Sequence, residues 1–249
     1  MPDNNNYSLS IQPIAVIHSP FPEKFGIPRQ SGLADNLAEI HFMPAYRNVD
    51  AVRGLEGFDY LWLIWCFSKN IHPEKEEIFH PTVRPPRLGG NTRMGVFATR
   101  SSFRPNGLAL SSVKIVKIDL ECPGAPVITV SGADLMDGTP IYDIKPYLPY
   151  ADAHPEARGG FTDAYSNGEY RLEVQIMDSF WRAVREMDKK KPGTEAIIHK
   201  LLPQVLSVLS EDPRPSYQKD PNRIYGMSYG DYNFRFTVDE KVLYLREMA

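Results

Sequence analysis

The segment from Pro81 to Ser111, PTVRPPRLGGNTRMGVFATRSSFRPNGLALS, carries the residue types best suited to binding an anion. It contains five arginines and no Lys, Asp or Glu, although the whole chain has a formal net charge of −3. A guanidinium group is planar and always charged, and it matches phosphates, carboxylates and the faces of bases. We therefore predict an anion- or nucleotide-binding site, with ion pairing to acids elsewhere in the fold as the alternative. The five arginines are Arg84, Arg87, Arg93, Arg100 and Arg104.

A second polar cluster lies in the segment from Gly132 to Tyr150, GADLMDGTPIYDIKPYLPY. Asp134 and Asp137 are suited to accept hydrogen bonds from an amino group or from ribose hydroxyls, or to pair with the arginines of the first segment. The Asp137-Gly138 dipeptide predicts a tight turn. Lys145 is a further cation, beside a loop stiffened by proline.

The composition is that of a globular protein with many defined loops. A chain of 249 residues forms one large domain or two small ones. Its 22 prolines argue against a helical bundle. A pI near 6.1 argues against a generic nucleic-acid coat protein, but it permits an RNA-acting enzyme whose positive charge is confined to one patch.

Familiar catalytic and cofactor signatures are absent from the sequence. We find no GxGxxG after a strand, no P-loop, no HExxH and no GxSxG. Cys66 and Cys122 are too few for a disulfide framework or a zinc site, so we predict no metal. The first ten residues, MPDNNNYSLS, contain no signal-peptide core, and the longest apolar run, Leu61 to Phe67, is too short for a membrane span. We expect a cytoplasmic protein without membrane contact.

The hydrophobic pattern that must position these residues changes along the chain. Short apolar runs separated by Gly- and Pro-rich turns predict a mainly β N-terminal barrel domain. These expected strands are Ile11–Ile17, Leu37–Met43, Tyr60–Phe67, Met94–Thr99, Leu108–Ile118 and Val127–Ser131. After residue 168 a smaller α+β domain is expected, with strands at Tyr170–Ile176, Tyr232–Val238 and Val242–Leu245 and helices around Phe180–Met187 and Ile198–Leu209.

Three divisions of the chain follow from this pattern. Residues 1–151 are expected to form the barrel domain and residues 169–249 the α+β domain. Residues 152–168, rich in Pro, Gly, Ala and charge, are the expected linker.

Two residues are expected to shape the second helix of the α+β domain. Thr194 is its expected N-cap, and Pro203 is expected to kink it.

Five segments, met in this order, resemble one family. They are SPFPEKFGIPRQ, AVRGLEGFDYLWLIWCF, PTVRPPRLGGNTRMGVFATRSSFRPN, DLMDGTPIYDIKPYLPY and EDPRPSYQ. In sequence they are similar to the TsaA-like proteins, the tRNA threonylcarbamoyladenosine methyltransferases called TrmO. The resemblance covers most of the first 150 residues and part of the remainder.

The resemblance implies an S-adenosylmethionine-dependent enzyme that methylates N6 of the threonylcarbamoyladenosine beside the anticodon of certain tRNAs. It also implies a cofactor-binding β-barrel and a homodimer. Carried onto this chain, the cofactor-binding residues are Pro28, Arg29, Gln30, Ser68, Lys69, Arg100, Leu110 and the run Asp134, Leu135, Met136, Asp137. The expected RNA-binding residues are Arg84, Arg87, Phe103, Arg104 and Lys145. The alternative for the three arginines is support of the cofactor pocket, and the alternative for Phe103 is burial in the core.

Two departures from the family pattern touch the expected cofactor pocket. The family usually has FRPNPIGLS, and this chain has FRPNGLALS, so Gly107-Leu108-Ala109 replaces a Pro-Ile-Gly turn. Ser68-Lys69 stands where relatives often carry His-Gln or a similar pair.

Chemistry assigns two roles that the sequence leaves open. The urea-like N6 of the substrate is acidic enough for a carboxylate to accept its proton, and either Asp134 or Asp137 is the expected catalytic base. The threonyl carboxylate calls for a bidentate partner, which Arg104 or Arg87 can supply. The alternatives are a small-molecule methyltransferase with a closed, apolar pocket, and a non-catalytic module that only binds S-adenosylmethionine.

Overall fold

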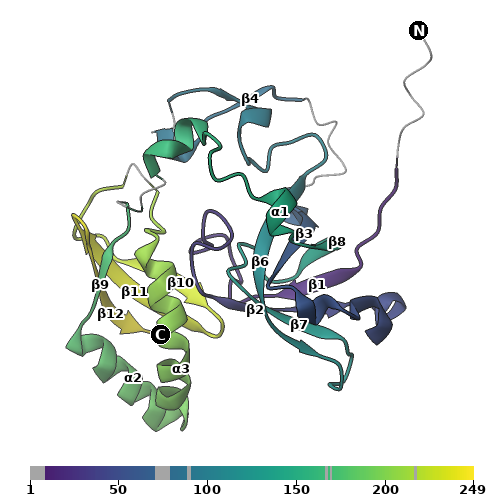
Figure 1. Ribbon diagram of the computed structural model, residues 1–249. Coiled ribbons are helices and arrows are strands. Elements are labelled where there is room, and N and C mark those ends of the chain that lie inside the picture. The colour runs from purple at the N-terminus through teal and green to yellow at the C-terminus, as the bar shows by residue number, and fades with distance from the viewer. Residues whose placement is uncertain (1–8, 71–78, 89–90, 166–167, 169, 216–217) are drawn as a thin grey trace.

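The computed structural model of the chain is shown in Figure 1. It describes residues 9–70, 79–88, 91–165, 168, 170–215 and 218–249, with the side chains of Asn70, Arg87 and Tyr165 left out. Two units lie side by side, a β-barrel and a smaller α+β unit (Figure 1). The fold class expected from the sequence is therefore confirmed.

Six antiparallel strands close the barrel in the order β1-β2-β7-β6-β3-β8. The strands bury side chains in a core that includes Ile17, Ile40, Leu63, Ile128 and Ile141, and in β1 and β2 the buried side chains alternate along the strand. Because a closed barrel has no free edge, every one of these strands is paired on both sides. The strands are β1 Ala15–His18, β2 Leu37–Phe42, β3 Tyr60–Cys66, β6 Leu108–Asp119, β7 Val127–Ser131 and β8 Thr139–Pro146.

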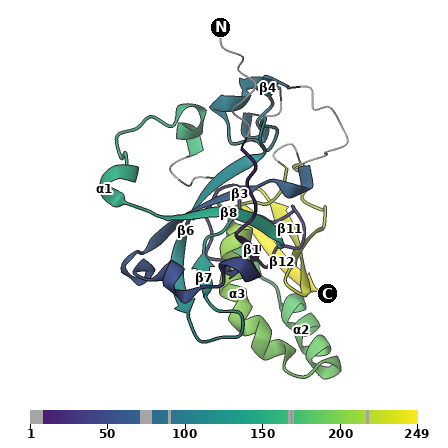
Figure 2. The ribbon, with the colours of Figure 1, turned by 90° about the vertical axis from the view of Figure 1, so that its right-hand side faces the viewer.

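The segment before β6 does not join the barrel. It contains the two-residue strands β4, Thr82–Val83, and β5, Met94–Gly95, which pair only with each other. The strand expected over Met94–Thr99 is wrong beyond Gly95, because Val96–Ala98 forms a 3₁₀ turn and Phe97 is 71% exposed. This segment lies above one end of the barrel in both views (Figures 1 and 2).

The α+β unit has a four-stranded sheet in the order β10-β11-β12-β9, with two helices packed against it. Ile198, Leu202, Val205 and Leu209 are buried at the helical spacing expected for the second helix, which also contains Pro203. The elements are β9 Glu173–Ile176, α2 Asp178–Lys190, α3 Thr194–Ser210, β10 Tyr225–Tyr229, β11 Tyr232–Asp239 and β12 Val242–Met248; the short helix α1, Pro149–Asp152, follows β8.

The expected N-cap of α3 is wrong. Gly193, with φ +94°, occupies that position, and Thr194 is the first helical residue. Two backbone N–H groups at the start of the helix are bound instead by Asp188 of α2, whose Oδ1 accepts from the backbone nitrogens of Gly193 at 2.9 Å and Glu195 at 3.1 Å. A carboxylate from a neighbouring helix thus replaces the local cap.

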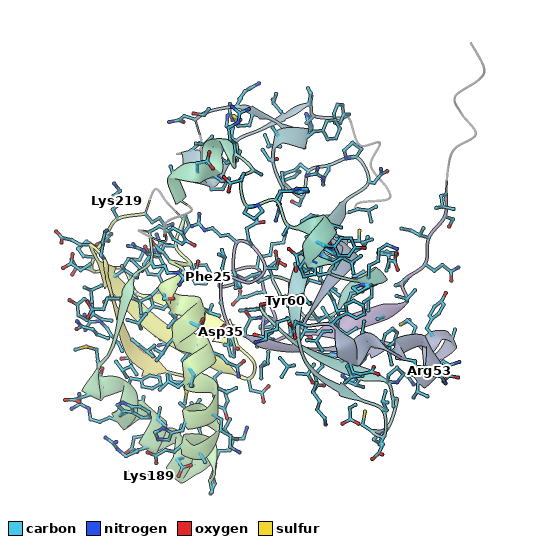
Figure 3. The ribbon with its side chains drawn as sticks, in the orientation of Figure 1. Phe25, Asp35, Arg53, Tyr60, Lys189 and Lys219 are labelled. Atoms are coloured by element: carbon cyan, nitrogen blue, oxygen red, sulfur yellow. The ribbon has the colours of Figure 1, made fainter. Side chains whose placement is uncertain are left out.

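The loop between β1 and β2, residues 19–36, joins the two units. Phe21 and Ala34 of this loop are buried in the core of the α+β unit, where Phe21 packs edge-on against Tyr229. Gln204 of α3 also contacts the barrel, since its Oε1 accepts from the backbone nitrogen of Leu37 at 2.8 Å. Figure 3 places Phe25 and Asp35 of the loop at this junction. The α+β unit therefore holds the loop that carries Pro28, Arg29 and Gln30.

Gly132, just after β7, fixes the same loop against the barrel. Its carbonyl accepts from the backbone nitrogen of Gly32 at 2.8 Å, its φ is +82°, and a Cβ built on it would lie 3.1 Å from backbone atoms of Gly32. We expect Gly132→Ala to lower the free energy of unfolding by about 2–4 kcal/mol, from the left-handed conformation and the clash together. Urea unfolding measures this loss.

Gly54→Ala is the matched control. Gly54 has φ +87°, but a Cβ there meets no described atom within 4 Å, so only the conformational cost of about 1–2 kcal/mol remains. Equal losses for the two variants would show that the approach of Gly32 contributes nothing.

Candidate functional site

A cavity of about 650 Å³ opens at the barrel end that faces the arginine-rich segment. Its size is within the range of small-molecule sites. Five stretches of chain that are distant in sequence line it, namely parts of 24–30, 64–69, 99–104, 108–111 and 134–139.

Most of the cofactor-binding residues expected from the sequence line this cavity. Two do not. Leu135 is fully buried in the barrel core, and Asp137 is exposed on the far side of the turn, where its Oδ1 accepts from the backbone nitrogen of Ser19 at 3.0 Å. The residues that line the cavity are Pro28, Arg29, Gln30, Ser68, Lys69, Arg100, Leu110, Asp134 and Met136.

The expected RNA-binding residues are spread more widely. Arg104 lines the cavity, and its Nη1 donates to the carbonyl of Thr99 at 2.8 Å. Phe103 is 69% exposed, Arg84 is exposed, and Lys145 is paired with Asp143 at 2.8 Å; none of the three lines the cavity. The side chain of Arg87 lies outside the described residues.

Hydrogen bonds from both units hold the 28–30 loop at the cavity. Arg100 Nη1 donates to Gln30 Oε1 at 2.6 Å, which ties the loop to the arginine-rich segment. Arg29 Nη2 donates to the carbonyl of Arg214 at 3.0 Å, and Arg214 is itself paired with Asp212 at 2.8 Å. The EDPRP part of the C-terminal motif, residues 211–215, thus supports the cavity wall from the second unit.

Gly107 closes the turn that replaces the family's usual Pro-Ile-Gly. Its backbone nitrogen donates to the carbonyl of Arg104 at 3.0 Å, and its φ is +59°. A proline at this position could not adopt that φ, because its ring fixes φ near −65°. The altered sequence therefore fits the turn that starts β6 at Leu108 in this chain.

Asp134 is the acid of the cavity wall. Its Oδ1 accepts from Ser111 Oγ at 2.6 Å, and Ser111 Oγ accepts in turn from Trp65 Nε1 at 2.9 Å. Burial raises the pKa of Asp134 above its usual range, and the bonds from Ser111 and from the backbone together with the charge of Arg100 counteract part of that rise. A carboxylate with a raised pKa in a cavity is suited to accept a proton.

Trp65 and Ser111 were not singled out in the sequence. Both lie in strands that the pattern did predict, but neither periodicity nor residue type shows which strand residues face the open end of a barrel. The one signal in the sequence for this pair is that Ser111 lies near the start of a long, largely apolar strand.

The charge of the cavity wall is strongly positive. Among the described residues that line the cavity, Asp134 is the single acid, and five residues are cations. The cations come from three loops: Lys24 and Arg29, Lys69, and Arg100 and Arg104. A wall of this kind attracts an anionic partner.

No metal or membrane feature accompanies the site in the described part of the chain. There, no group of three or more His, Cys, Asp or Glu side chains is placed to hold a metal ion. Within the same residues, no helix combines the length and apolar character needed to cross a membrane. The lysine run Lys189–Lys191 is not part of the cavity lining. Lys189 lies at the lower end of the helices in Figure 3 and pairs with Glu186 at 2.5 Å.

Comparison with known proteins gives consistent matches over both units. Residues 16–153 match the family described as tRNA-methyltransferase O N-terminal domain, and residues 169–249 match the TrmO C-terminal domain. The chain is 40% identical over 237 residues to the tRNA (adenine(37)-N6)-methyltransferase of Escherichia coli, covering 94% of each chain. It is 40% identical over 226 residues to a putative S-adenosylmethionine-dependent methyltransferase, RcsF, of Pseudomonas aeruginosa, covering 89% of each. A crystal structure of TrmO from P. aeruginosa superposes with a TM-score of 0.73 at 30% identity, covering 97% of each chain.

Proposed function

Since the chain belongs to the TrmO family, as both domain matches and the relatives show, we propose that it is an S-adenosylmethionine-dependent tRNA methyltransferase acting on N6 of threonylcarbamoyladenosine next to the anticodon. The family resemblance found in the sequence is thereby confirmed. We also propose that it acts in the cytoplasm, as expected from the sequence pattern, and that it forms a homodimer, as the resemblance implies.

One observation supports the RNA part of this proposal: the described residues that line the cavity include five cations and one acid. S-adenosylmethionine carries a net positive charge, so the cofactor does not account for this surplus. A tRNA backbone and a threonyl carboxylate do, because both are anionic. A small-molecule methyltransferase with a closed apolar pocket does not fit this wall.

The lining residues also fit the cofactor. Trp65 and Phe67 offer aromatic faces for a cation, and Asp134 offers a carboxylate for its positive or hydroxyl groups. S-adenosylmethionine supplies the electrophilic methyl group when it is bound. Arg29, Gln30 and Arg100 would orient the bound cofactor and substrate. Asp134 would accept the proton that N6 releases when it is methylated.

The test uses purified protein, radiolabelled S-adenosylmethionine and two batches of tRNA. One batch carries threonylcarbamoyladenosine, and the other comes from cells unable to make it. We expect label to enter only the modified batch. Label in neither batch, with cofactor binding intact, would instead indicate a small-molecule methyltransferase or a binding module, and label in both would remove the threonylcarbamoyl group as the recognised feature.

A further inference from the structure

A chain of three hydrogen-bonded side chains crosses the barrel at the cavity. Trp65 near the end of β3 donates to Ser111 in β6, and Ser111 donates to Asp134 just beyond β7. These three strands are neighbours in the barrel, in the order β7-β6-β3. Ser111 is 1% exposed and Trp65 is 6% exposed, so the inner part of the chain is shielded from water.

The direction of this chain is fixed by its first member. An indole N–H can only donate, so the oxygen of Ser111 must act as the acceptor towards Trp65. The single proton of the Ser111 hydroxyl is then committed to Asp134 Oδ1, at 2.6 Å. A buried hydroxyl that lost either partner would leave a polar group unsatisfied, so the arrangement resists rotation.

Other groups also act on Asp134. The backbone of Ser31 in the β1–β2 loop donates to it, and Arg100 attracts its charge. The cavity also brings Arg29 and Lys24 from that loop, Lys69 and the Cys66 thiol from the β3 end, and Arg104 from the 99–104 loop. The cations favour the charged carboxylate, as Ser111 does, and burial opposes it.

We propose that Ser111, oriented by Trp65, is a positioning residue that holds the Asp134 carboxylate in one orientation and in its charged form. This rests on the proposed function of the cavity, in which the charged form of Asp134 accepts the N6 proton. Ser111 touches neither reactant in this role and acts only through Asp134.

Ser111→Ala removes the donor and keeps the small size of the side chain. The pKa of Asp134 should then rise further, because a bond to the charged form is lost. As the pH is lowered, the variant should lose activity at a higher pH than the wild type does. At the acid end of the profile its kcat should be about ten- to a hundredfold below that of the wild type. The KM for S-adenosylmethionine should change much less.

Two further variants test the same contact. Ser111→Thr keeps the hydroxyl and should restore the wild-type pH profile. Trp65→Phe should shift the acid limb of the profile in the same direction as Ser111→Ala, but by less.

A second readout needs no methyl transfer. Carbon NMR of the Asp134 carboxyl in the full-length protein follows its titration, and we expect the midpoint to move to higher pH in Ser111→Ala and to return in Ser111→Thr. Ser112→Ala, the same change at the next residue of β6, is the control.

An unmoved titration midpoint in Ser111→Ala, or an equal shift in Ser112→Ala, would overturn the proposal even if the wild type methylates tRNA. Failure of the wild type to methylate any tRNA would instead refute the function and leave the titration result standing. If Ser111→Ala does not fold, Ser111→Cys carries a weak donor of similar size and should shift the midpoint in the same direction.

Discussion

Asp134→Asn is expected to lower kcat for tRNA methylation by about 10²- to 10⁴-fold, the usual contribution of a general base. The amide keeps the shape of the side chain and an oxygen that can accept from Ser111, so the cavity wall is retained. It cannot take up a proton at neutral pH. Affinity for S-adenosylmethionine should therefore fall far less than turnover, which calorimetric titration and single-turnover kinetics measure separately.

The role of Asp134 as the base also predicts the direction in which activity changes with pH. Burial raises the pKa of Asp134, and the active form is the deprotonated one, so wild-type activity should be lost as pH falls through a value above the usual range for aspartate. That acidic limb should disappear in Asp134→Asn, because the titrating group is gone.

Asp137→Asn is the matched variant that separates the two aspartates left open by the sequence. The Asp137 carboxylate accepts from the backbone nitrogen of Ser19 and lies 3.5 Å from the ring of His18, outside the cavity lining. We expect a much smaller loss of turnover. Unchanged turnover in Asp134→Asn, or a larger loss in Asp137→Asn, would remove Asp134 as the base.

The strands of the barrel show how much of the fold the hydrophobic pattern predicts. The continuous apolar run over Tyr60–Phe67 and the segment Val127–Ser131 were predicted almost to the residue. In β6 the alternation of VKIVKI is broken, and the structure explains this by a register shift between Ile115 and Lys117 in its pairing with β7. A bulge changes which side chains face inward without changing the identity of the strand.

Strand β8 was missed for a different reason. The Asp137-Gly138 turn does occur, with the backbone nitrogen of Thr139 donating to the carbonyl of Met136 at 3.2 Å, but β8 begins immediately after it. Pro140 and Pro146 within β8 made the segment resemble a loop. Pairing on both sides in a closed barrel outweighs the poor local propensity.

The site was predictable where a motif marked it and unpredictable where long-range packing made it. Arg29 and Asp134 come from segments that carry the family resemblance, and both line the cavity. The support of Arg29 by the carbonyl of Arg214, 185 residues later in the chain, has no local signal. Phe21 likewise lies in a Pro-rich loop of the first domain, and yet it is buried in the core of the second.

Arg104→Gln is expected to lower kcat/KM for tRNA carrying threonylcarbamoyladenosine by about 10- to 100-fold, the strength of a hydrogen bond to a charged group. Arg104 lines the cavity, and its bonds to the carbonyls of Thr99 and Ser101 both use Nη1. The guanidinium has two further nitrogens, which can form a parallel pair of bonds with the threonyl carboxylate. Affinity for S-adenosylmethionine and the melting temperature, measured alongside, report any displacement of the 99–104 loop.

The substrate itself provides the decisive comparison for Arg104. An anticodon-loop RNA whose threonyl carboxylate is converted to a methyl ester lacks the charge that the fork would bind. Wild-type protein should lose activity on the ester to about the level of Arg104→Gln, and the variant should treat acid and ester alike, because coupled groups are not additive. Arg104→Lys keeps the charge but not the fork, so it should resemble Arg104→Gln if Arg104 binds the carboxylate and the wild type if it only attracts phosphates. If the methyl ester and Arg104→Gln each lower the activity fully and independently of the other, the threonyl carboxylate is bound by another residue.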